Sequence, residues 1–354
     1  MKARKPTEVC ITVDTEFSIG GNFYNPGFLP VAEPIVLGAI EGKEHGLGFL
    51  LDSFREFGVS ATFFVEALQT AYFGDEPMGR IARRIADEGQ DVQLHLHPCW
   101  LHYEQVAGAG LTAVTNDSCA GRTDADLERF FRSGLGAFHR WGLPRPVAVR
   151  AGNFQVDANF YRAAAQSGFR RSSSVALPAW RPADKQLLLA DGTHRIGSVL
   201  ELPVFCFNEG LGHKQRLRML SITACSDFEI VSVLRQARSR GLSPVIIATH
   251  PQEFIKRKHA RYVKEPWDRL DPNRLKHVLQ YDTLRRNRVN QTRLRAVLKF
   301  LHQTRDQYVT VPISAIANDR SRSGSTRDPR ISVSSPMTIA RMLENAVNDL
   351  VWWY

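Results

Sequence analysis

Cysteines, long apolar runs and nucleotide-binding glycine motifs are scarce or missing in this chain. The 354 residues include only five cysteines, widely scattered and without a CxxC pair, which argues against a disulfide framework and against a zinc knuckle. No stretch approaches the roughly 18 uninterrupted apolar residues of a membrane-spanning helix, and the N-terminal MKARKPTEVCITVD lacks the apolar run of a signal peptide. No GxGxxG or GxxxxGK motif supports a nucleotide-binding fold. These absences predict a cytoplasmic location.

The composition is that of a globular protein with an excess of basic residues. Hydrophobic residues make up 43% of the chain and charged residues 23%. The net charge of +10 favours an anionic partner such as a phosphate or an anionic membrane surface. Much of the excess lies in residues 254–271 and 281–300, and the second segment is predicted to be an amphipathic helix. A solvent-exposed helix face is the commoner explanation for such basic residues. Because no motif that reads a nucleic acid groove accompanies them, we expect no nucleic acid partner.

Strand-like and helix-like segments alternate along the chain. Short apolar, β-branched runs predict seven strands, at 9–14, 60–65, 91–97, 146–152, 199–205, 243–250 and 307–314. Apolar residues at three-to-four-residue spacing predict helices at 44–57, 76–88, 124–141, 157–167, 228–240 and 283–303. Several strands are almost continuously apolar, as expected when both faces of a parallel sheet are covered. We therefore predict an α/β fold, a (β/α) barrel of about seven parallel strands, complete or slightly open, with a doubly wound open sheet as the alternative.

The C-terminal part differs in composition from the rest. Residues 1–315 contain the predicted barrel, whereas 316–335 are rich in Ser, Arg, Asp and Gly and are predicted to form a flexible linker. Ser335 is a plausible cap, Pro336 follows at the first helical position, and the apolar residues after it have helical spacing. Residues 336–354 are therefore predicted to form a terminal helix that docks on the barrel or on another subunit. The sequence does not predict the oligomeric state.

Charged or titratable side chains stand at the carboxyl ends of four predicted strands. In barrels and in open parallel sheets, active sites are built on that face. Taken singly, each has an ordinary explanation, such as a helix cap or an exposed side chain, but together they indicate a site because buried charge is costly without a partner or a function. These residues are Asp14, Glu16, His95, His97, Arg150 and His250.

The spacing of these residues favours a metal. Residues two apart in a strand share a face, so His95 and His97 can direct both imidazoles to one point, and Pro98 ends the strand there. Asp14 and Glu16 are also two apart. One carboxylate would bind a divalent metal with the two histidines, and the other would remain free to accept a proton. Because such a metal lowers the pKa of bound water to about 7, this pattern indicates metal-assisted hydrolysis. The alternative is a pair of half-buried polar residues at a strand end.

Four short motifs resemble those of a known family. ITVDTEF, HLHP, VRAGNF and ATHP, in this order over residues 10–251, are similar to the first, second, third and last motifs of the polysaccharide deacetylases, the NodB-homology carbohydrate esterases of family four. The resemblance covers about residues 8–315 and is nearest to the WalW-like branch, which is associated with bacterial surface polysaccharide clusters. It implies a distorted (β/α) barrel.

The resemblance also implies a set of metal ligands. Glu16 stands in place of the metal-binding aspartate, and His95 matches the first histidine ligand. His97 is the preferred second histidine, with His102 as a rival because the common family pattern separates its histidines by more residues. The implied ion is zinc, with cobalt or another divalent ion as alternatives.

Three further residues resemble the catalytic groups of the family. Asp14 resembles the general base, Arg150 the arginine that pairs with it, and His250 the histidine that acts as general acid towards the leaving amine. No segment matches the tryptophan-containing fourth motif, and LELPVF with Glu201 stands about where that motif belongs.

The predicted activity is removal of an N-acyl group, acetyl in the first place, from an amino sugar in bacterial surface polysaccharide metabolism. The expected partner is an acylated amino sugar or a polysaccharide precursor. One alternative is deformylation or deacetylation of a lipid-carrier-linked sugar, with peripheral contact of the basic helix to an anionic membrane. A second is hydrolysis of a non-sugar amide. A third, kept open by the missing fourth motif and the histidine spacing, is a non-catalytic, metal-free barrel that acts as a scaffold or binding protein.

Overall fold

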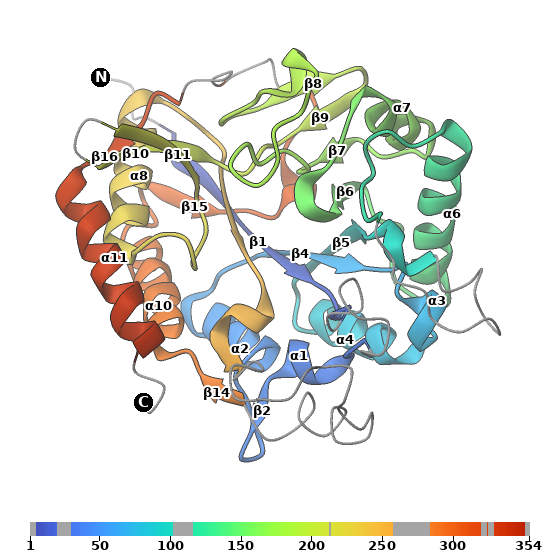
Figure 1. The fold of residues 1–354 in the computed structure, drawn as a ribbon, viewed down its shortest axis with the longest axis horizontal. Helices are drawn as coiled ribbons and strands as arrows, with labels where there is room; N and C mark the ends of the chain where they lie inside the picture. Colours follow the sequence, from blue (N-terminus) through green and yellow to red (C-terminus); the bar gives the residue numbers. More distant parts are fainter. Residues whose placement is uncertain are drawn as a thin grey trace, which may run out of the picture.

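A curled, mostly parallel sheet forms a half-barrel at the centre of the molecule (Figure 1). The computed structural model describes residues 5–19, 30–101, 116–211, 214–257, 284–319, 324 and 329–350. Its sheet contains β1 (Thr7–Thr15), β4 (Thr62–Glu66), β5 (Asp91–Leu96), β6 (Ala148–Ala151), β7 (Arg171–Ser172), β8 (His194–Ile196), β9 (Val199–Glu201), β12 (Val245–Thr249) and β15 (Tyr308–Thr310). The order is β12-β1-β4-β5-β6-β7-β9-β8, with β15 also paired to β1, and only the β8–β9 pair is antiparallel. The prediction of a distorted (β/α) barrel is confirmed.

All seven predicted strands lie in this sheet, and two strands were missed. β7 is two residues long and β8 three, and neither contains the apolar run from which the other strands were predicted. The strand order also decides between the two predicted architectures. It advances in one direction from β1 to β9 and brings the late strand β12 back beside β1, without the reversal of a doubly wound sheet.

Alternate residues of each strand face two separate cores. The inner core contains no α-helical residue and includes Cys10, Phe64, Ala148 and Ile246. Side chains alternate along a strand, so every second residue, counted from any of these four, faces the same inner side. In β1, Asp14 therefore lies on the same side of the strand as Cys10. The inner columns are therefore apolar deep in the barrel and become polar at their carboxyl ends.

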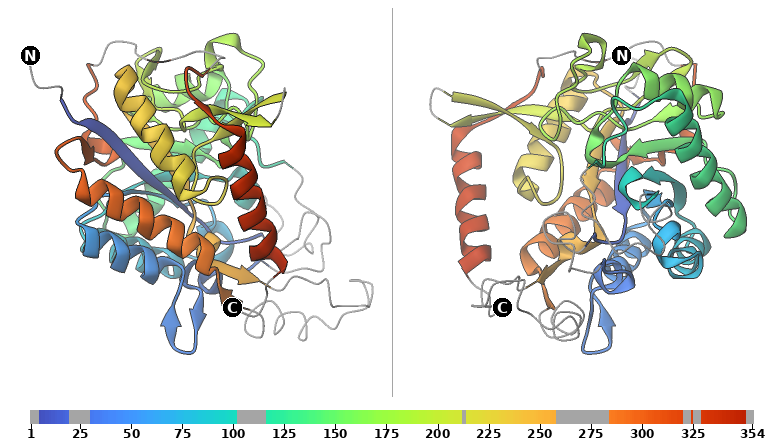
Figure 2. Two further views of the ribbon diagram at one scale, coloured as in Figure 1. Left: turned by 90° about the vertical axis from the view of Figure 1, so that its left-hand side faces the viewer. Right: turned by 45° about the vertical axis from the view of Figure 1, so that its right-hand side comes forward.

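Helices cover the outside of the half-barrel. The six predicted helices are present as α2 (Leu47–Phe57), α4 (Glu76–Asp87), α6 (Asp124–Arg140), α7 (Ala158–Gln166), α8 (Asp227–Arg240) and α10 (Arg288–Gln303). Their buried apolar residues join one face of the strands in the larger, outer core. Capping boxes fix the starts of α6, at Thr123 with Asp126, and of α8, at Ser226 with Glu229. α2, α10 and α8 lie side by side (Figure 2).

Short elements connect these layers. They comprise α1 (Glu33–Leu37), α3 (Thr70–Phe73), the β2–β3 hairpin (Ala39–Ile40, Lys43–Glu44), and the antiparallel pair β13–β14 (Ile255–Arg257, Leu284–Arg286). Single 3-10 turns follow the strand ends of the site, η1 (Pro98–Leu101) after β5, η2 (Gly152–Phe154) after β6 and η4 (Pro251–Phe254) after β12; two more are η3 (Lys185–Leu187) and η6 (Ile313–Ala315). Because β14 occupies residues 284–286, the predicted helix 283–303 begins later, at Arg288.

The C-terminal helix docks on the barrel. α11 (Ser335–Leu350) contacts α8 and β10 (Cys206–Leu211), which pairs with β11 (Lys214–Met219) and with β16 (Ser332–Val333). Buried Arg341 of α11 forms ion pairs with Glu209 and Glu229. β16 lies within the segment predicted as a linker, and its Val333 is buried. The division of the chain into barrel, linker and helix stays a prediction.

The cysteines and the apolarity of the helices were also considered in the sequence. All five cysteines are buried, and none of them is part of a disulfide bond. No helix in the described ranges is both long enough and apolar enough to span a bilayer. The cytoplasmic location stays a prediction.

Candidate metal centre and active site

The residues named from the sequence gather at the carboxyl ends of neighbouring strands. The structure places all six at one end of the barrel: Asp14 in β1, His95 in β5 and Arg150 in β6, with Glu16, His97 and His250 directly after β1, β5 and β12. They come together because parallel strands all end on the same face. His102, the rival second histidine, lies outside the described residues.

Glu16 and the two histidines form a group of three potential metal ligands. The Oε2 atom of Glu16 lies 3.1 Å from His95 Nε2 and 2.7 Å from His97 Nε2. One ligand atom from each residue lies within 4.8 Å of the other two. The side chains of Glu16 and His97 are partly exposed, so the group is open to solvent on one side. Three protein ligands with an open position are typical of a catalytic divalent site.

The other ring nitrogen of each histidine is occupied by an acceptor. His95 Nδ1 lies 2.9 Å from the Arg150 carbonyl oxygen, and His97 Nδ1 lies 2.5 Å from Asp117 Oδ2. When Nδ1 donates to these oxygens, the lone pair of each neutral ring is on Nε2, which faces Glu16. Metal-binding histidines usually have this arrangement. The donor set therefore fits a divalent cation.

The charges of the group also fit a cation. Burial by itself raises the pKa of Glu16, but the charge on His97 and hydrogen bonds from both histidines hold that pKa well below its usual range. Burial lowers the pKa of His97, but the carboxylates of Asp117 and Glu16 raise it well above its usual value. The His97 proton thus compensates two nearby carboxylates, and a bound divalent cation would supply the same compensation.

Asp14 and Arg150 form a buried ion pair beside this group. Arg150 Nη1 donates to Asp14 Oδ1 over 2.6 Å, and both side chains are almost completely buried. Arg150 also donates to Thr12 and to the backbone and hydroxyl oxygens of Ser173, and its guanidinium lies 4.3 Å from the ring centroid of Phe64. Because these contacts fix the guanidinium, they also fix the carboxylate of Asp14. Its second oxygen remains directed towards His250.

His250 faces Asp14 on one side and Glu253 on the other. Its Nε2 lies 3.8 Å from Asp14 Oδ2, and its Nδ1 lies 3.0 Å from Glu253 Oε1. Thr249 and the backbone N–H of His250 donate to the other oxygen of Glu253. Burial lowers the pKa of His250, but the Glu253 carboxylate, with further help from Asp14, raises it to about 9. His250 is therefore protonated at neutral pH and has a proton to donate.

Two residues after β6 have backbone features that serve the site. A Cβ atom on Gly152 would lie 2.5 Å from the ring of His97, so only glycine leaves room for that ring. Asn153 has a φ of 54°, which is uncommon outside glycine, and its amide donates to Asp117. Strained residues of this kind cluster at functional sites.

Several supporting residues were missed in the sequence. Glu66 is fully buried at the end of β4 and accepts hydrogen bonds from the backbone N–H groups of Leu68, Gln69 and His97. Asp117 and Glu253 were missed as well. Glu253 could have been found from its place three residues after His250, but Asp117 is 20 residues from His97 and nothing in the sequence links them.

Glu201, at the place of the missing fourth motif, is not part of the site. It is fully buried, and it accepts hydrogen bonds from the Tyr161 hydroxyl and from the backbone N–H groups of Ser174 and Val175. Burial raises its pKa. These contacts give Glu201 a structural role that joins β9 to the segment after β7.

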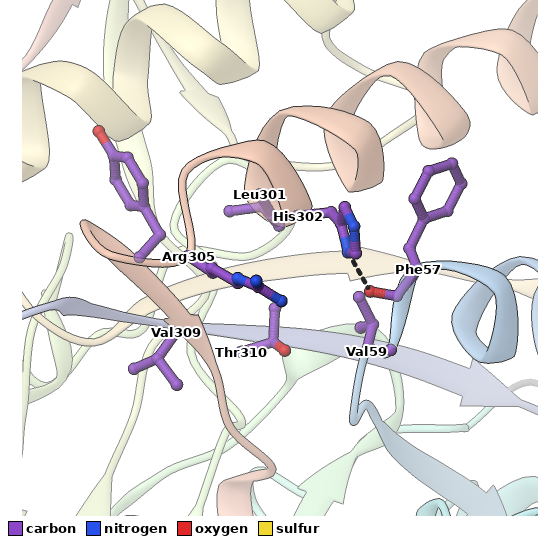
Figure 3. A pocket seen from close by; sticks show the side chains of 9 residues that line it. Phe57, Val59, Leu301, His302, Arg305, Val309 and Thr310 are labelled. Carbon is purple, nitrogen blue, oxygen red and sulfur yellow. Dashed lines mark hydrogen bonds between the residues drawn. The ribbon is translucent and has the colours of Figure 1, made fainter.

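A cavity of about 290 Å³ lies at the opposite end of the barrel (Figure 3). It is placed where the chain enters β4 and β15, and within it His302 Nδ1 bonds to the Phe57 carbonyl. Its lining contains no carboxylate side chain and consists of Phe57, Gly58, Val59, Leu301, His302, Arg305, Tyr308, Val309 and Thr310. The cavity is therefore separate from the candidate site.

The basic helix α10, for which membrane contact was one predicted alternative, forms ion pairs within the fold with some of its arginines. Arg293 of α10 is buried and bonds to Glu344, and Arg295 pairs with Glu56. Residues 258–283, which contain most of the other basic segment, lie outside the described ranges. Peripheral membrane contact and a lipid-carrier-linked substrate stay predictions.

Comparisons with known proteins gave matches among solved structures only. No family model matches the chain, and no curated protein matches it. A family 4 carbohydrate esterase from Streptomyces lividans in complex with acetate is 12% identical, and the match covers 92% of this chain and 100% of that one, with a TM-score of 0.41. A family 4 carbohydrate esterase pseudoenzyme from Bacillus anthracis is 10% identical, with 92% and 70% covered and a TM-score of 0.41.

A third match, from Mycobacterium smegmatis, is described as a polysaccharide deacetylase; it is 16% identical, with 71% and 79% covered and a TM-score of 0.41. The WalW-like branch stays a prediction.

Proposed function

We propose that this protein is a divalent-metal-dependent hydrolase that removes an N-acyl group, acetyl in the first place, from an amino sugar of a bacterial surface polysaccharide or its precursor. One observation carries the proposal. A three-ligand group, an arginine-bound carboxylate and a histidine paired with Glu253 meet at one end of the barrel, with the arginine-bound carboxylate and the histidine 3.8 Å apart. These are the groups that amide hydrolysis needs.

Glu16, His95 and His97 would hold the cation, and zinc is an ion that two imidazoles and one carboxylate can bind in a catalytic site. When bound, it supplies Lewis acidity, which polarises the amide carbonyl and lowers the pKa of a water molecule. The resemblance to the polysaccharide deacetylases supports the choice of an acylated sugar as the substrate.

The proton transfers fall to Asp14 and His250. Asp14 accepts a proton from the water that adds to the carbonyl carbon, and the hydrogen bond from Arg150 holds the Asp14 carboxylate in position. The C–N bond then breaks with its electron pair on nitrogen, and His250 donates its proton to that nitrogen. The products are a carboxylic acid and a free amino sugar. His250 can donate because the Glu253 carboxylate favours its protonated form, and Asp14 can accept because Arg150 holds only one of its two oxygens.

The test is metal content together with deacylation. Wild-type protein purified without a histidine tag should contain about one zinc or similar ion per chain and should release acetate from N-acetylated sugar oligomers. The variant with both His95→Ala and His97→Ala should lose the metal and the activity. His302→Ala, which alters a histidine at the opposite end of the barrel, is the matched control. A wild-type chain that takes up neither zinc nor cobalt would reject the hydrolase and favour the metal-free scaffold.

A further inference from the structure

The rings of His95 and His97 each have one hydrogen-bond partner besides Glu16, a backbone carbonyl for His95 and a side-chain carboxylate for His97. His95 has one partner besides Glu16, the Arg150 carbonyl. His97 has the Asp117 carboxylate on Nδ1, and the carboxylate of Glu66 on its backbone N–H. Asp117 is fixed in turn, because its Oδ2 also accepts from Asn153 and its Oδ1 accepts from the backbone N–H of Cys99.

We propose that Asp117, oriented by Asn153, is the positioning residue of His97, and that it sets the affinity of the site by fixing the tautomer and the angle of that ring. This inference rests on the proposed function, since it takes His97 as a metal ligand. Asp117 contributes no ligand atom of its own. It acts by accepting the Nδ1–H of His97, which leaves Nε2 as the ligand atom of the neutral ring and directs it at the space beside Glu16.

The geometry explains why the orientation of the His97 ring depends on a hydrogen bond from outside β5. The rings of His95 and His97 are nearly perpendicular, at 86°, with centroids 4.8 Å apart. His97 follows the last residue of β5, beyond the strand ladder that fixes the backbone of His95. Its ring packs against the Cβ-free Gly152, which provides space but no hydrogen bond. The Asp117 bond therefore restricts a rotation that this packing leaves open.

The position of Asp117 suits a positioning residue of His97 better than a metal ligand. His97, Cys99 and Asp117 form a second group of potential ligands, but this group would need the His97 ring, which the first group also uses. The His97 ring and the Asn153 amide already occupy Asp117 Oδ2, and both donate hydrogen bonds to it. A carboxylate that accepts from a metal-binding histidine is a common supporting contact, and its removal typically weakens metal binding by about 10–100-fold.

The first test measures metal affinity. Zinc or cobalt is titrated into the metal-free full-length chain in competition with a chromophoric chelator. Asp117→Ala should bind one ion per chain about 10–100-fold more weakly than wild type. Asn153→Gly keeps the backbone conformation of φ 54° and removes only the amide, so it should weaken binding less, in the same direction. Asp124→Ala, which removes an exposed acid paired with Arg162, is the matched control and should bind as wild type does.

The second test observes the tautomer directly. In the proton NMR spectrum of the cobalt-loaded protein, two shifted, slowly exchanging Nδ1–H signals are expected from His95 and His97. Asp117→Ala should lose one of them to exchange with water, whereas a merely structural role would leave both. The unfolding midpoint of each metal-free variant reports whether it is folded, and Asn153→Gly keeps the test decisive should Asp117→Ala fail to fold.

The outcomes separate this inference from the proposed function. A wild-type chain that binds no ion overturns both. Equal affinity of wild type, Asp117→Ala and Asn153→Gly overturns this inference alone. Complete loss of stoichiometric binding in Asp117→Ala, as in His97→Ala, also overturns it, because Asp117 would then be a ligand.

Discussion

Asp14 and Glu16 are chemically alike and two residues apart, yet their neighbours differ. Asp14 is buried beside Arg150, and Glu16 is partly exposed beside His95 and His97. A carboxylate that is held by an arginine and directed towards a histidine suits proton transfer, whereas one that faces two imidazole nitrogens suits a metal. The spacing in the sequence indicated two roles for the pair, and the contacts favour one assignment of those roles.

Asp14→Asn and Glu16→Gln should therefore separate catalysis from metal binding. Asp14→Asn keeps an oxygen for Arg150 but cannot accept a proton, so kcat should fall by about 10²–10⁴-fold with the metal retained. Glu16→Gln should lose the metal. Steady-state kinetics and elemental analysis of the same preparations measure both. Loss of metal from Asp14→Asn would reverse the assignment.

Glu253 should control the pH range of activity through His250. Burial lowers the pKa of His250 and the Glu253 carboxylate raises it, to about 9 in total. Activity that needs protonated His250 falls as the pH rises through this pKa. Glu253→Gln removes the charge that raises it, so the alkaline limb of kcat/KM should move to lower pH. The pH–rate profile measures this, with exposed Glu76→Gln as the control; an unmoved alkaline limb would exclude His250 as the general acid.

At the scale of elements, the 3-10 turns after the strands position the side chains that lie at the strand ends. η2 after β6 brings Gly152 against His97, and η4 after β12 brings Glu253 back to His250. Strand ends could be predicted because apolar β-branched runs end in charged residues. The turns could not, because their conformation depends on contacts with residues distant in the sequence.

Gly152→Ala should damage the site through the η2 turn. The new Cβ would lie 2.5 Å from the His97 ring, so the ring or the turn must move, at a cost of about 1–3 kcal/mol of stability. Metal affinity should fall as well. Gly136→Ala in α6 is the contrasting control, since its Cβ meets only the flexible tip of Arg140, and alanine should stabilise the helix by about 0.5–1 kcal/mol. Chemical denaturation and metal titration measure both variants; unchanged metal affinity in Gly152→Ala would show that the ring position is unimportant.

At the scale of the whole molecule, the C-terminal helix belongs to the fold through buried charges. Arg341 is 4% exposed and bonds to Glu209 and Glu229, which lie on β10 and α8. The amphipathic pattern of α11 predicted a helix, but the surface it docks on is formed by elements more than 100 residues earlier.

Arg341→Ala should cost about 3 kcal/mol of unfolding free energy, because buried Glu229 loses its ion pair, although Glu209 keeps its pair with Arg218. Denaturant unfolding measures the loss. Arg132→Ala, which removes an exposed pair with Glu128, should change stability by less than about 0.5 kcal/mol. Similar stability of Arg341→Ala and wild type would mean that α11 contributes little to the fold.

The sequence by itself determined the alternation of strands and helices and the set of six residues at the strand ends, because these depend on side-chain period and on polarity along a single segment. It also predicted a two-histidine, two-carboxylate site. The family resemblance implied which carboxylate meets Arg150 and which meets the histidines, whereas only the tertiary structure added Asp117, Glu253 and Glu66. Those contacts join different segments, so they exist only once the sheet has curled and brought its strand ends together.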